Sequence, residues 1–149
     1  MKKILSIGLV LAALLIATAA PAAAADGATA TITKAWVIGR PGGPLLNLGS
    51  EGTGAITVPP GAKLIIMGMA KKDGKEAMSF NLFNTTAEPA QPVVTKAFQA
   101  KAKKQAKVIQ NKFTPVSEGD YTFRFNVSDE SGIELDWAEF TVTVESPLP

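Results

Sequence analysis

The sequence predicts an all-β fold, a sandwich of two antiparallel sheets with about seven to nine strands. Short segments in which apolar and polar residues alternate recur along the chain, and Gly- and Pro-containing turns separate them. These segments are enriched in β-branched and aromatic residues, which favour strands. The 149-residue chain contains no cysteine, so the fold must rest on core burial and strand pairing alone.

The N-terminal segment has the pattern of a secretory signal peptide. Lys2 and Lys3 precede an apolar run over residues 4–20, and small residues follow at 21–25. The apolar run is shorter than the roughly 20 residues of a spanning helix, so we expect no transmembrane segment in the mature chain. The short signal and alanine-rich cleavage region are typical of bacteria. We therefore expect a signal peptide at 1–25, a single sandwich domain at 26–149, and a secreted protein that is periplasmic or extracellular.

The first half of the mature chain supplies several strands. Residues 29–38 have the alternating pattern of a strand, and residues 39–54 resemble a Gly/Pro-rich loop. Residues 55–58 are expected to form a short strand that ends before two prolines. Residues 62–70 are apolar at both alternating positions, which predicts a central strand covered on both faces. An Asp-Gly turn then predicts that residues 62–70 and 77–84 form a hairpin.

Residues 91–113 contain six lysines and no acidic residue, and two interpretations are open. A helix would place Phe98, Ile109 and Phe113 roughly on one face. Two strands, 93–100 and 106–113, would instead be joined by a turn at residues 103–104. The strand interpretation is favoured, and lysine-rich edge strands would also resist edge-to-edge aggregation.

The C-terminal third predicts two more strands. Tyr121, Phe123, Phe125 and Val127 alternate with polar residues and share one face. The final strand changes phase near Trp137, which predicts a bulge or bend.

The segment EGDYTFRFNVSDESG, followed by AEFTVTV, resembles the last two strands of bacterial immunoglobulin-like modules, and in particular polycystic-kidney-disease-type extracellular domains. The matching positions are Gly119, Tyr121, Phe123, Phe125, Asp129, Gly132, Phe140, Val142 and Val144. The resemblance implies an immunoglobulin-like sandwich in which Tyr121 closes a corner by bonding to upstream backbone. It implies no particular function. Residues 58–84 also resemble the middle strands of galectin-type sandwiches, but the residues of the galectin sugar site are absent.

Composition argues against an enzyme. The chain has neither histidine nor cysteine, so it lacks the commonest general base and the usual activated nucleophile pairs. Charge is unevenly distributed: residues 26–112 contain twelve Lys and Arg against five Asp and Glu, whereas 113–149 contain one Arg against eight acids. The mature chain is neutral overall, which removes support for nucleic-acid binding.

We therefore expect a non-catalytic binding module that engages a protein, an anionic surface or a polysaccharide through a lysine-rich tract. The tract consists of Lys96, Lys101, Lys103, Lys104, Lys107 and Lys112. The alternative is a structural subunit of an extracellular assembly, in which opposite charges on neighbouring copies meet and the protein self-associates.

Two metal hypotheses are weaker, and we expect no cofactor. Four clustered carboxylates offer oxygen ligands for calcium, but a solvated acidic hairpin is the simpler explanation: Asp129, Glu130, Glu134 and Asp136. Met67, Met69 and Met78 offer thioethers to copper(I), as in a periplasmic metal or ligand carrier, but core packing is the simpler explanation.

Overall fold

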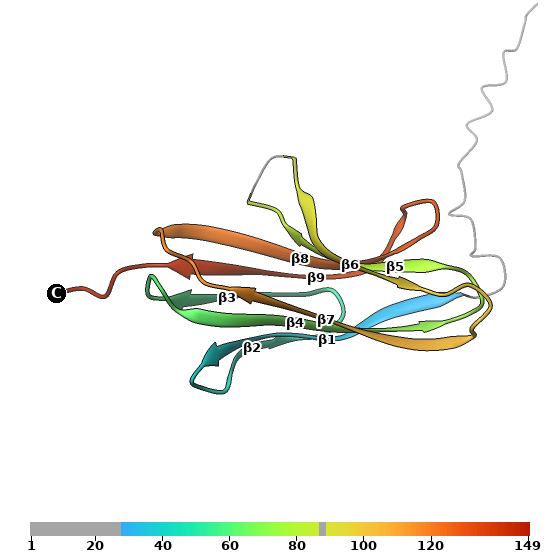
Figure 1. Ribbon diagram of the computed structural model, residues 1–149, viewed down its shortest axis with the longest axis horizontal. Coiled ribbons are helices and arrows are strands. Elements are labelled where there is room, and N and C mark those ends of the chain that lie inside the picture. The colour runs from blue at the N-terminus through green and yellow to red at the C-terminus, as the bar shows by residue number, and fades with distance from the viewer. Residues whose placement is uncertain (1–27, 87–88) are drawn as a thin grey trace, which may run out of the picture.

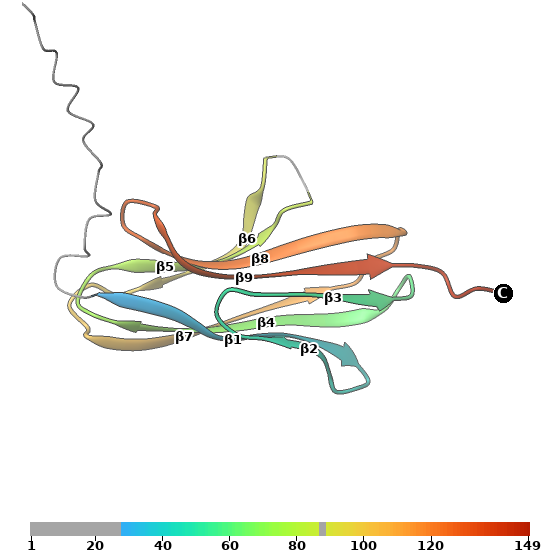
Figure 2. The ribbon, with the colours of Figure 1, turned by 180° about the vertical axis from the view of Figure 1, so that it is seen from behind.

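The computed structural model describes residues 28–86 and 89–149, and the expected signal peptide lies outside this part of the chain. The described residues form nine strands and no helix (Figures 1 and 2). The strands are β1 (Thr29–Arg40), β2 (Pro44–Leu48), β3 (Gly52–Val58), β4 (Lys63–Asp73), β5 (Met78–Asn84), β6 (Gln91–Phe98), β7 (Lys104–Phe113), β8 (Gly119–Asp129) and β9 (Glu134–Val144).

The strands form two sheets stacked face to face, as Figure 1 shows. The four-stranded sheet has the order β2-β1-β4-β7, and the five-stranded sheet has the order β3-β9-β8-β5-β6. Neighbouring strands pair antiparallel except β3 and β9, which are parallel. The predicted all-β, immunoglobulin-like sandwich is confirmed. Within residues 28–86 and 89–149 there is no helix with the length and apolar character needed to cross a membrane.

Five phenylalanines fill the space between the sheets, and all are fully buried: Phe80, Phe98, Phe123, Phe125 and Phe140. The rings of Phe123 and Phe140 stack with centroids 5.5 Å apart. Gly68 of β4 lies directly opposite Phe125, and a Cβ at this position would be 2.5 Å from the ring atom Cε1. Glycine at position 68 therefore lets the two sheets approach closely around the aromatic core.

Alternation predicted the strand faces correctly. Tyr121, Phe123, Phe125 and Val127 of β8 all turn toward the core. Residues 91–113 form two strands, β6 and β7, so the strand interpretation is confirmed and the helical one is wrong. Residues 44–48, within the expected loop, form the edge strand β2 because they pair with β1.

The predicted hairpin over residues 62–84 is wrong. β4 pairs with β1 and β7, whereas β5 pairs with β6 and β8 in the other sheet. The Asp-Gly turn carries the chain between sheets, with Gly74 at a φ of 121° and its N–H donating to the Lys103 carbonyl at 2.7 Å. Turn chemistry specifies a chain reversal but not the sheet that the next strand joins.

A buried carboxylate lies between the sheets, close to two bulges. The β1 ladder shifts between Ile32 and Lys34, and the β8–β9 ladder shifts between Val127 and Ser128. The second shift confirms the predicted change of phase, which lies at Leu135, just before Trp137. Asp136 keeps the inward phase that Ala138 and Phe140 have in β9. Its Oδ2 accepts the N–H of Ile32 at 2.6 Å, and its Oδ1 accepts the Ser50 hydroxyl at 2.7 Å. Asp136 therefore joins β9 of one sheet to β1 of the other.

Candidate binding face

The outer face of the four-stranded sheet carries an unusual row of apolar side chains. Every second residue of β4 turns into the core, and the residues between them face outward. Met67 lies between Trp36 of β1 and Gln110 of β7 in the strand register. The row, here called the apolar stripe, consists of Trp36, Ile38, Ile65, Met67, Met69 and Val108. The second apolar phase of residues 62–70 is thus on the surface of the sandwich, whereas the sequence predicted that both faces would be covered.

Cations surround this stripe. Six exposed basic residues share the outer face and define, with the stripe, the basic face: Lys34, Arg40, Lys63, Lys71, Lys104 and Lys112. Asp73 is the carboxylate that the register places among them. Within residues 28–86 and 89–149, none of the six has a carboxylate oxygen within 4 Å. Lys34 instead places its ammonium 5.0 Å from the centre of the Trp36 ring. Over the strands that form it, the basic face therefore presents a net positive charge, with six cations and one carboxylate, Asp73.

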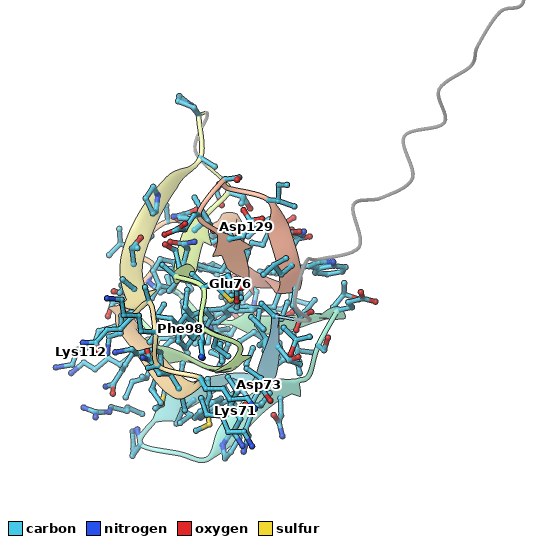
Figure 3. All side chains as sticks on the ribbon, turned by 90° about the vertical axis from the view of Figure 1, so that its right-hand side faces the viewer. Lys71, Asp73, Glu76, Phe98, Lys112 and Asp129 are labelled. Carbon is cyan, nitrogen blue, oxygen red and sulfur yellow. The ribbon has the colours of Figure 1, made fainter. Side chains whose placement is uncertain are left out.

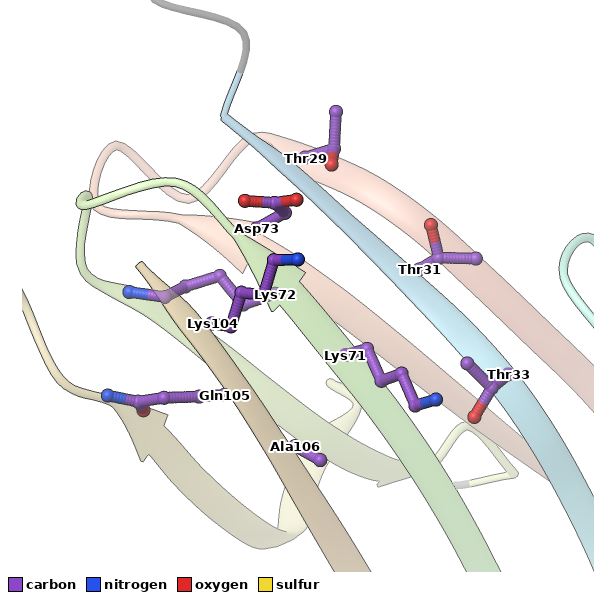
Figure 4. A pocket seen from close by; sticks show the side chains of 9 residues that line it. All are labelled: Thr29, Thr31, Thr33, Lys71, Lys72, Asp73, Lys104, Gln105 and Ala106. Carbon is purple, nitrogen blue, oxygen red and sulfur yellow. The ribbon is translucent and has the colours of Figure 1, made fainter. Parts of the chain in front are cut away.

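A shallow hollow of about 590 Å³ lies at one end of the basic face (Figure 4). Three threonines of β1 line one side, and residues of β4 and β7 line the rest: Thr29, Thr31, Thr33, Lys71, Lys72, Asp73, Lys104, Gln105 and Ala106. Hydroxyl and ammonium groups are donors that suit phosphate, sulfate or carboxylate groups. The hollow is thus chemically suited to an anionic group.

Lys72 differs from the other lysines because its side chain is buried. It turns into the sandwich, where its ammonium donates to the carbonyl oxygens of Glu76 and Gln99, each at 2.7 Å. These two carbonyls belong to the segments that follow β4 and β6. Lys72 therefore closes one end of the sandwich and is not free to bind a partner.

The structure divides the predicted lysine tract among three places. Lys104 and Lys112 lie on the basic face, and Figure 3 shows Lys112 pointing outward. Lys101 and Lys103 lie in the connection between β6 and β7. Lys96 and Lys107 sit opposite core residues in the ladders of the two edge strands β6 and β7.

Sequence reasoning missed four cations of the basic face: Lys34, Arg40, Lys63 and Lys71. These residues are far apart in the sequence and meet only through the pairing of β1 with β4. In β4, side chains alternate between the two faces of the sheet. If residues 64, 66 and 70 are assigned to the core, Lys63 and Lys71 must therefore face outward. The pairing itself had no signal in the sequence.

The four carboxylates considered for calcium have separate roles. Asp129 caps its own turn by accepting the N–H groups of Ser131 and Ile133, each at 2.9 Å. Glu130 is exposed, Glu134 pairs with an arginine, and Asp136 is buried between the sheets. In the part of the chain that the structure describes, no group of three or more His, Cys, Asp or Glu side chains is arranged to hold a metal ion.

The methionines considered for copper are also separated. Met78 is buried in the core, as packing predicted. Met67 and Met69 lie half-buried on the basic face, so core packing was the wrong interpretation for these two.

The outer face of the five-stranded sheet has the opposite charge. We call it the acidic face, and its charged side chains are Asp120, Arg124, Glu134 and Glu139. Arg124 forms an ion pair with Glu134, donates through Nη1 to Glu139 Oε2 at 3.3 Å, and lies 4.5 Å over the Trp137 ring. Side-chain hydrogen bonds continue from β8 across two more strands, β5 and β6. Figure 3 places Asp129, which ends β8 of this sheet, on the opposite side of the sandwich from Lys71.

The Arg124 cluster shifts the protonation of its members. The hydrogen bond to Glu134 raises the pKa of Arg124 above its ordinary value, against a smaller effect of burial. Burial raises the pKa of Glu134, but hydrogen bonds from Arg124 and Asn126, together with the charge of Arg124, lower it by more. The net pKa of Glu134 is below its ordinary value of 4.5, so this carboxylate is ionised at neutral pH.

Comparisons with known proteins give similarity at the level of architecture. No protein-family model and no curated protein matches the chain. One similar solved structure is the crystal structure of the CARDB domain of the Pyrococcus furiosus protein PF1109, in complex with di-metal ions. Its sequence is 16% identical to this chain, the match covers 78% of this chain and 90% of that chain, and the TM-score is 0.46. The solution structure of that domain gives 17% identity, 78% and 95% coverage, and a TM-score of 0.46. The ASH/PapD-like domain 7 of human CEP192 gives 10% identity, 78% and 89% coverage, and a TM-score of 0.38.

Proposed function

We propose that this protein is a secreted, non-catalytic binding module whose basic face engages an anionic partner. The observation that supports the proposal is the gathering of six exposed cations, none paired with a carboxylate in the described chain, around the apolar stripe. Fields from clustered like charges attract oppositely charged partners and speed their association. The signal-like pattern of residues 1–25 supports export.

The basic face offers two kinds of contact. The hollow beside Thr29, Thr31 and Lys71 offers hydroxyl and ammonium donors to an anionic group. The apolar stripe offers area that a partner can remove from water, which stabilises binding by roughly 25 cal/mol per Å² of apolar surface. Protein-binding surfaces commonly combine an apolar centre with a polar rim. The face as a whole therefore suits an acidic macromolecule better than a single small ion.

The experiment measures binding of residues 26–149 to three anionic probes: poly-L-glutamate, polygalacturonate and vesicles that contain an anionic lipid. The double variant Lys71→Glu/Lys104→Glu reverses two charges of the basic face. We expect it to weaken binding to the probe that the protein prefers by about tenfold. Raising the salt concentration should weaken wild-type binding in the same direction.

A matched control separates the basic face from the lysine tract. The variant Lys96→Glu/Lys101→Glu makes the same charge change away from the basic face. We expect this control to bind nearly as well as the wild type. Equal losses in both variants would show that net charge governs binding, and absence of binding to all three probes at low salt would refute the proposal.

A further inference from the structure

The two outer faces of the sandwich are complementary in charge, and they lie on opposite sides of the molecule (Figures 1 and 2). We propose that the basic face of one copy binds the acidic face of the next copy, head to tail. This inference rests on the proposed function, because it names the partner of the basic face.

Two identical basic faces cannot pair with each other. A symmetric dimer through this face would bring six cations of one copy against six of the other, because a twofold contact uses the same patch twice. Like charges placed opposite each other across an interface cost several kcal/mol. The occupant of the basic face must therefore bring negative charge, and the described chain offers carboxylates on its own opposite face.

The apolar stripe is only partly shielded from water within one copy. Ile65 is 6% exposed although it lies outside the core cluster, and Ile38 and Lys112 flank it in the strand register. Val108, farther along the stripe, is 36% exposed. An apolar row of intermediate exposure on a sheet face is typical of a surface that a second sheet covers.

The acidic face has the accessible carboxylates that such a contact needs. The side chains of Glu134 and Glu139 are 33% and 37% exposed although both pair with Arg124, and Asp120 is also exposed. Alternate residues of β3 add a flat rim of small side chains, namely Thr53, Ala55 and Thr57. Within residues 28–86 and 89–149, Arg124 is the cation that the register places on this face, and lysines are absent from it.

The consequence of this geometry is an open assembly. Each copy uses its basic face for one neighbour and its acidic face for another, so the contact is heterologous. Two copies joined in this way still have one unused basic face and one unused acidic face, so further copies can add at either end. The mass of the assembly should therefore rise with concentration without stopping at the dimer.

The first experiment is light scattering after size exclusion, with sedimentation velocity, on residues 26–149 over a wide concentration range. We expect the mean mass to exceed that of the monomer at low salt, to rise with concentration, and to fall as salt screens the charges. A wild type that stays monomeric at every concentration and salt would overturn the inference. Retained binding to poly-L-glutamate in that case would leave the proposed function standing.

Mixing two variants tests the head-to-tail geometry. Lys71→Glu/Lys104→Glu removes the basic face, and Asp120→Lys/Glu139→Lys removes the acidic face, so we expect each variant alone to be monomeric. A mixture of the neutral variants Lys71→Gln/Lys104→Gln and Asp120→Asn/Glu139→Gln should form dimers that do not grow, because each copy retains one competent face and the two neutral faces do not attract each other. Thermal melting verifies that every variant is folded. If every variant still forms the same oligomers as the wild type, the proposed interface is wrong.

Discussion

The buried carboxylate of Asp136 is a structural link between the two sheets. Sequence placed it in a group of acids that suggested calcium. The structure gives it three donors instead: the N–H of Ile32, the hydroxyl of Ser50, and the N–H of Trp137 at 2.8 Å. The bulge in β1 leaves the Ile32 N–H near β9, and an unpaired buried N–H is costly, so an acceptor is needed here. No sequence pattern could show this, because the two residues lie 104 positions apart.

Replacing Asp136 should test that link. We expect Asp136→Ala to lower the free energy of unfolding by about 1–3 kcal/mol, because it leaves the buried Ile32 N–H without its acceptor. Urea unfolding monitored by tryptophan fluorescence measures the change. Asp136→Asn, which keeps an acceptor oxygen, should lose less than Asp136→Ala. Equal stability of Asp136→Ala and the wild type would contradict the assigned role.

Tyr121 closes a corner, as the resemblance to immunoglobulin-like modules implied. Its hydroxyl donates to the Ser117 carbonyl at 3.0 Å, and its ring packs edge-on against Phe113 with centroids 5.2 Å apart. Here the local pattern was sufficient, because donor and acceptor are four residues apart and the turn between them is encoded by adjacent residues.

Tyr121→Phe isolates the hydroxyl from the ring. We expect this variant to lose about 1 kcal/mol of unfolding free energy, the usual net value of one hydrogen bond. Chemical denaturation provides the measurement. Tyr121→Ala, which also removes the aromatic contact, should lose more, and a Phe variant as stable as the wild type would show that the hydroxyl bond does not stabilise the fold.

At the scale of elements, the β8–β9 pair is held on its outer surface by the Arg124 cluster. Hydrogen bonds run from Thr95 to Asn81 and from Asn81 to Asn126, each at 2.9 Å, and from Asn126 to Glu134 at 3.1 Å. The cluster thereby connects β6, β5 and β8 to the start of β9. Arg124 neutralises part of the acidic charge gathered at this end of the pair.

This cluster should make the stability of the β8–β9 pair depend on pH. Glu134 has a folded pKa below its ordinary 4.5, so its ionised form contributes stability that is full above that value and is lost as pH falls through the folded pKa. The variant Arg124→Met removes the ion-pair partner of Glu134. We expect the difference in unfolding free energy between wild type and Arg124→Met to be largest near neutral pH and to shrink below pH 4.5.

Thermal and urea unfolding of both proteins across acidic pH would measure that difference. Arg40→Met is a suitable control, because Arg40 has no carboxylate partner within 4 Å in the described residues. A difference that stays constant down to strongly acidic pH would contradict the assignment to Glu134.

Individual strands were far more predictable than their placement. The period-two pattern in β5 and β8 identified the buried side chains directly, because burial on one face imposes that period. The hairpin prediction failed at Gly74, where a common turn signal leads into the other sheet. Sheet membership depends on which strands meet after folding, and local turn residues do not encode it.

At the scale of the whole molecule, charge asymmetry along the chain becomes asymmetry between two surfaces. Strands β1, β4 and β7, from the basic part of the sequence, form the basic face. Strands β8 and β9, from the acidic part, form most of the acidic face. The sequence therefore predicted the two charges correctly. It misplaced the centre of the positive surface, because Lys34 and Lys71 contribute through pairing rather than through proximity to the lysine tract.

The edge strands show why the lysine tract is not one surface. Lys96 and Lys107 occupy ladder positions opposite Phe80 and Ala70, at the open side where β6 and β7 lie close together. Charged side chains on the inward phase of edge strands discourage pairing with other chains. We therefore expect part of the tract to discourage aggregation, and only part belongs to the basic face.

The parallel pairing of β3 with β9 affects when the chain can fold during synthesis. In the described sandwich, β3 joins its sheet through β9, and β9 is the last strand to be made. The sheet therefore cannot close until residue 144 has left the ribosome, whatever the earlier segments do. Folding that waits for the final strand leaves the nascent polypeptide extended for longer. An unfolded precursor is the form that can be threaded through a secretion channel, so late closure of this sheet would suit the secretion proposed above.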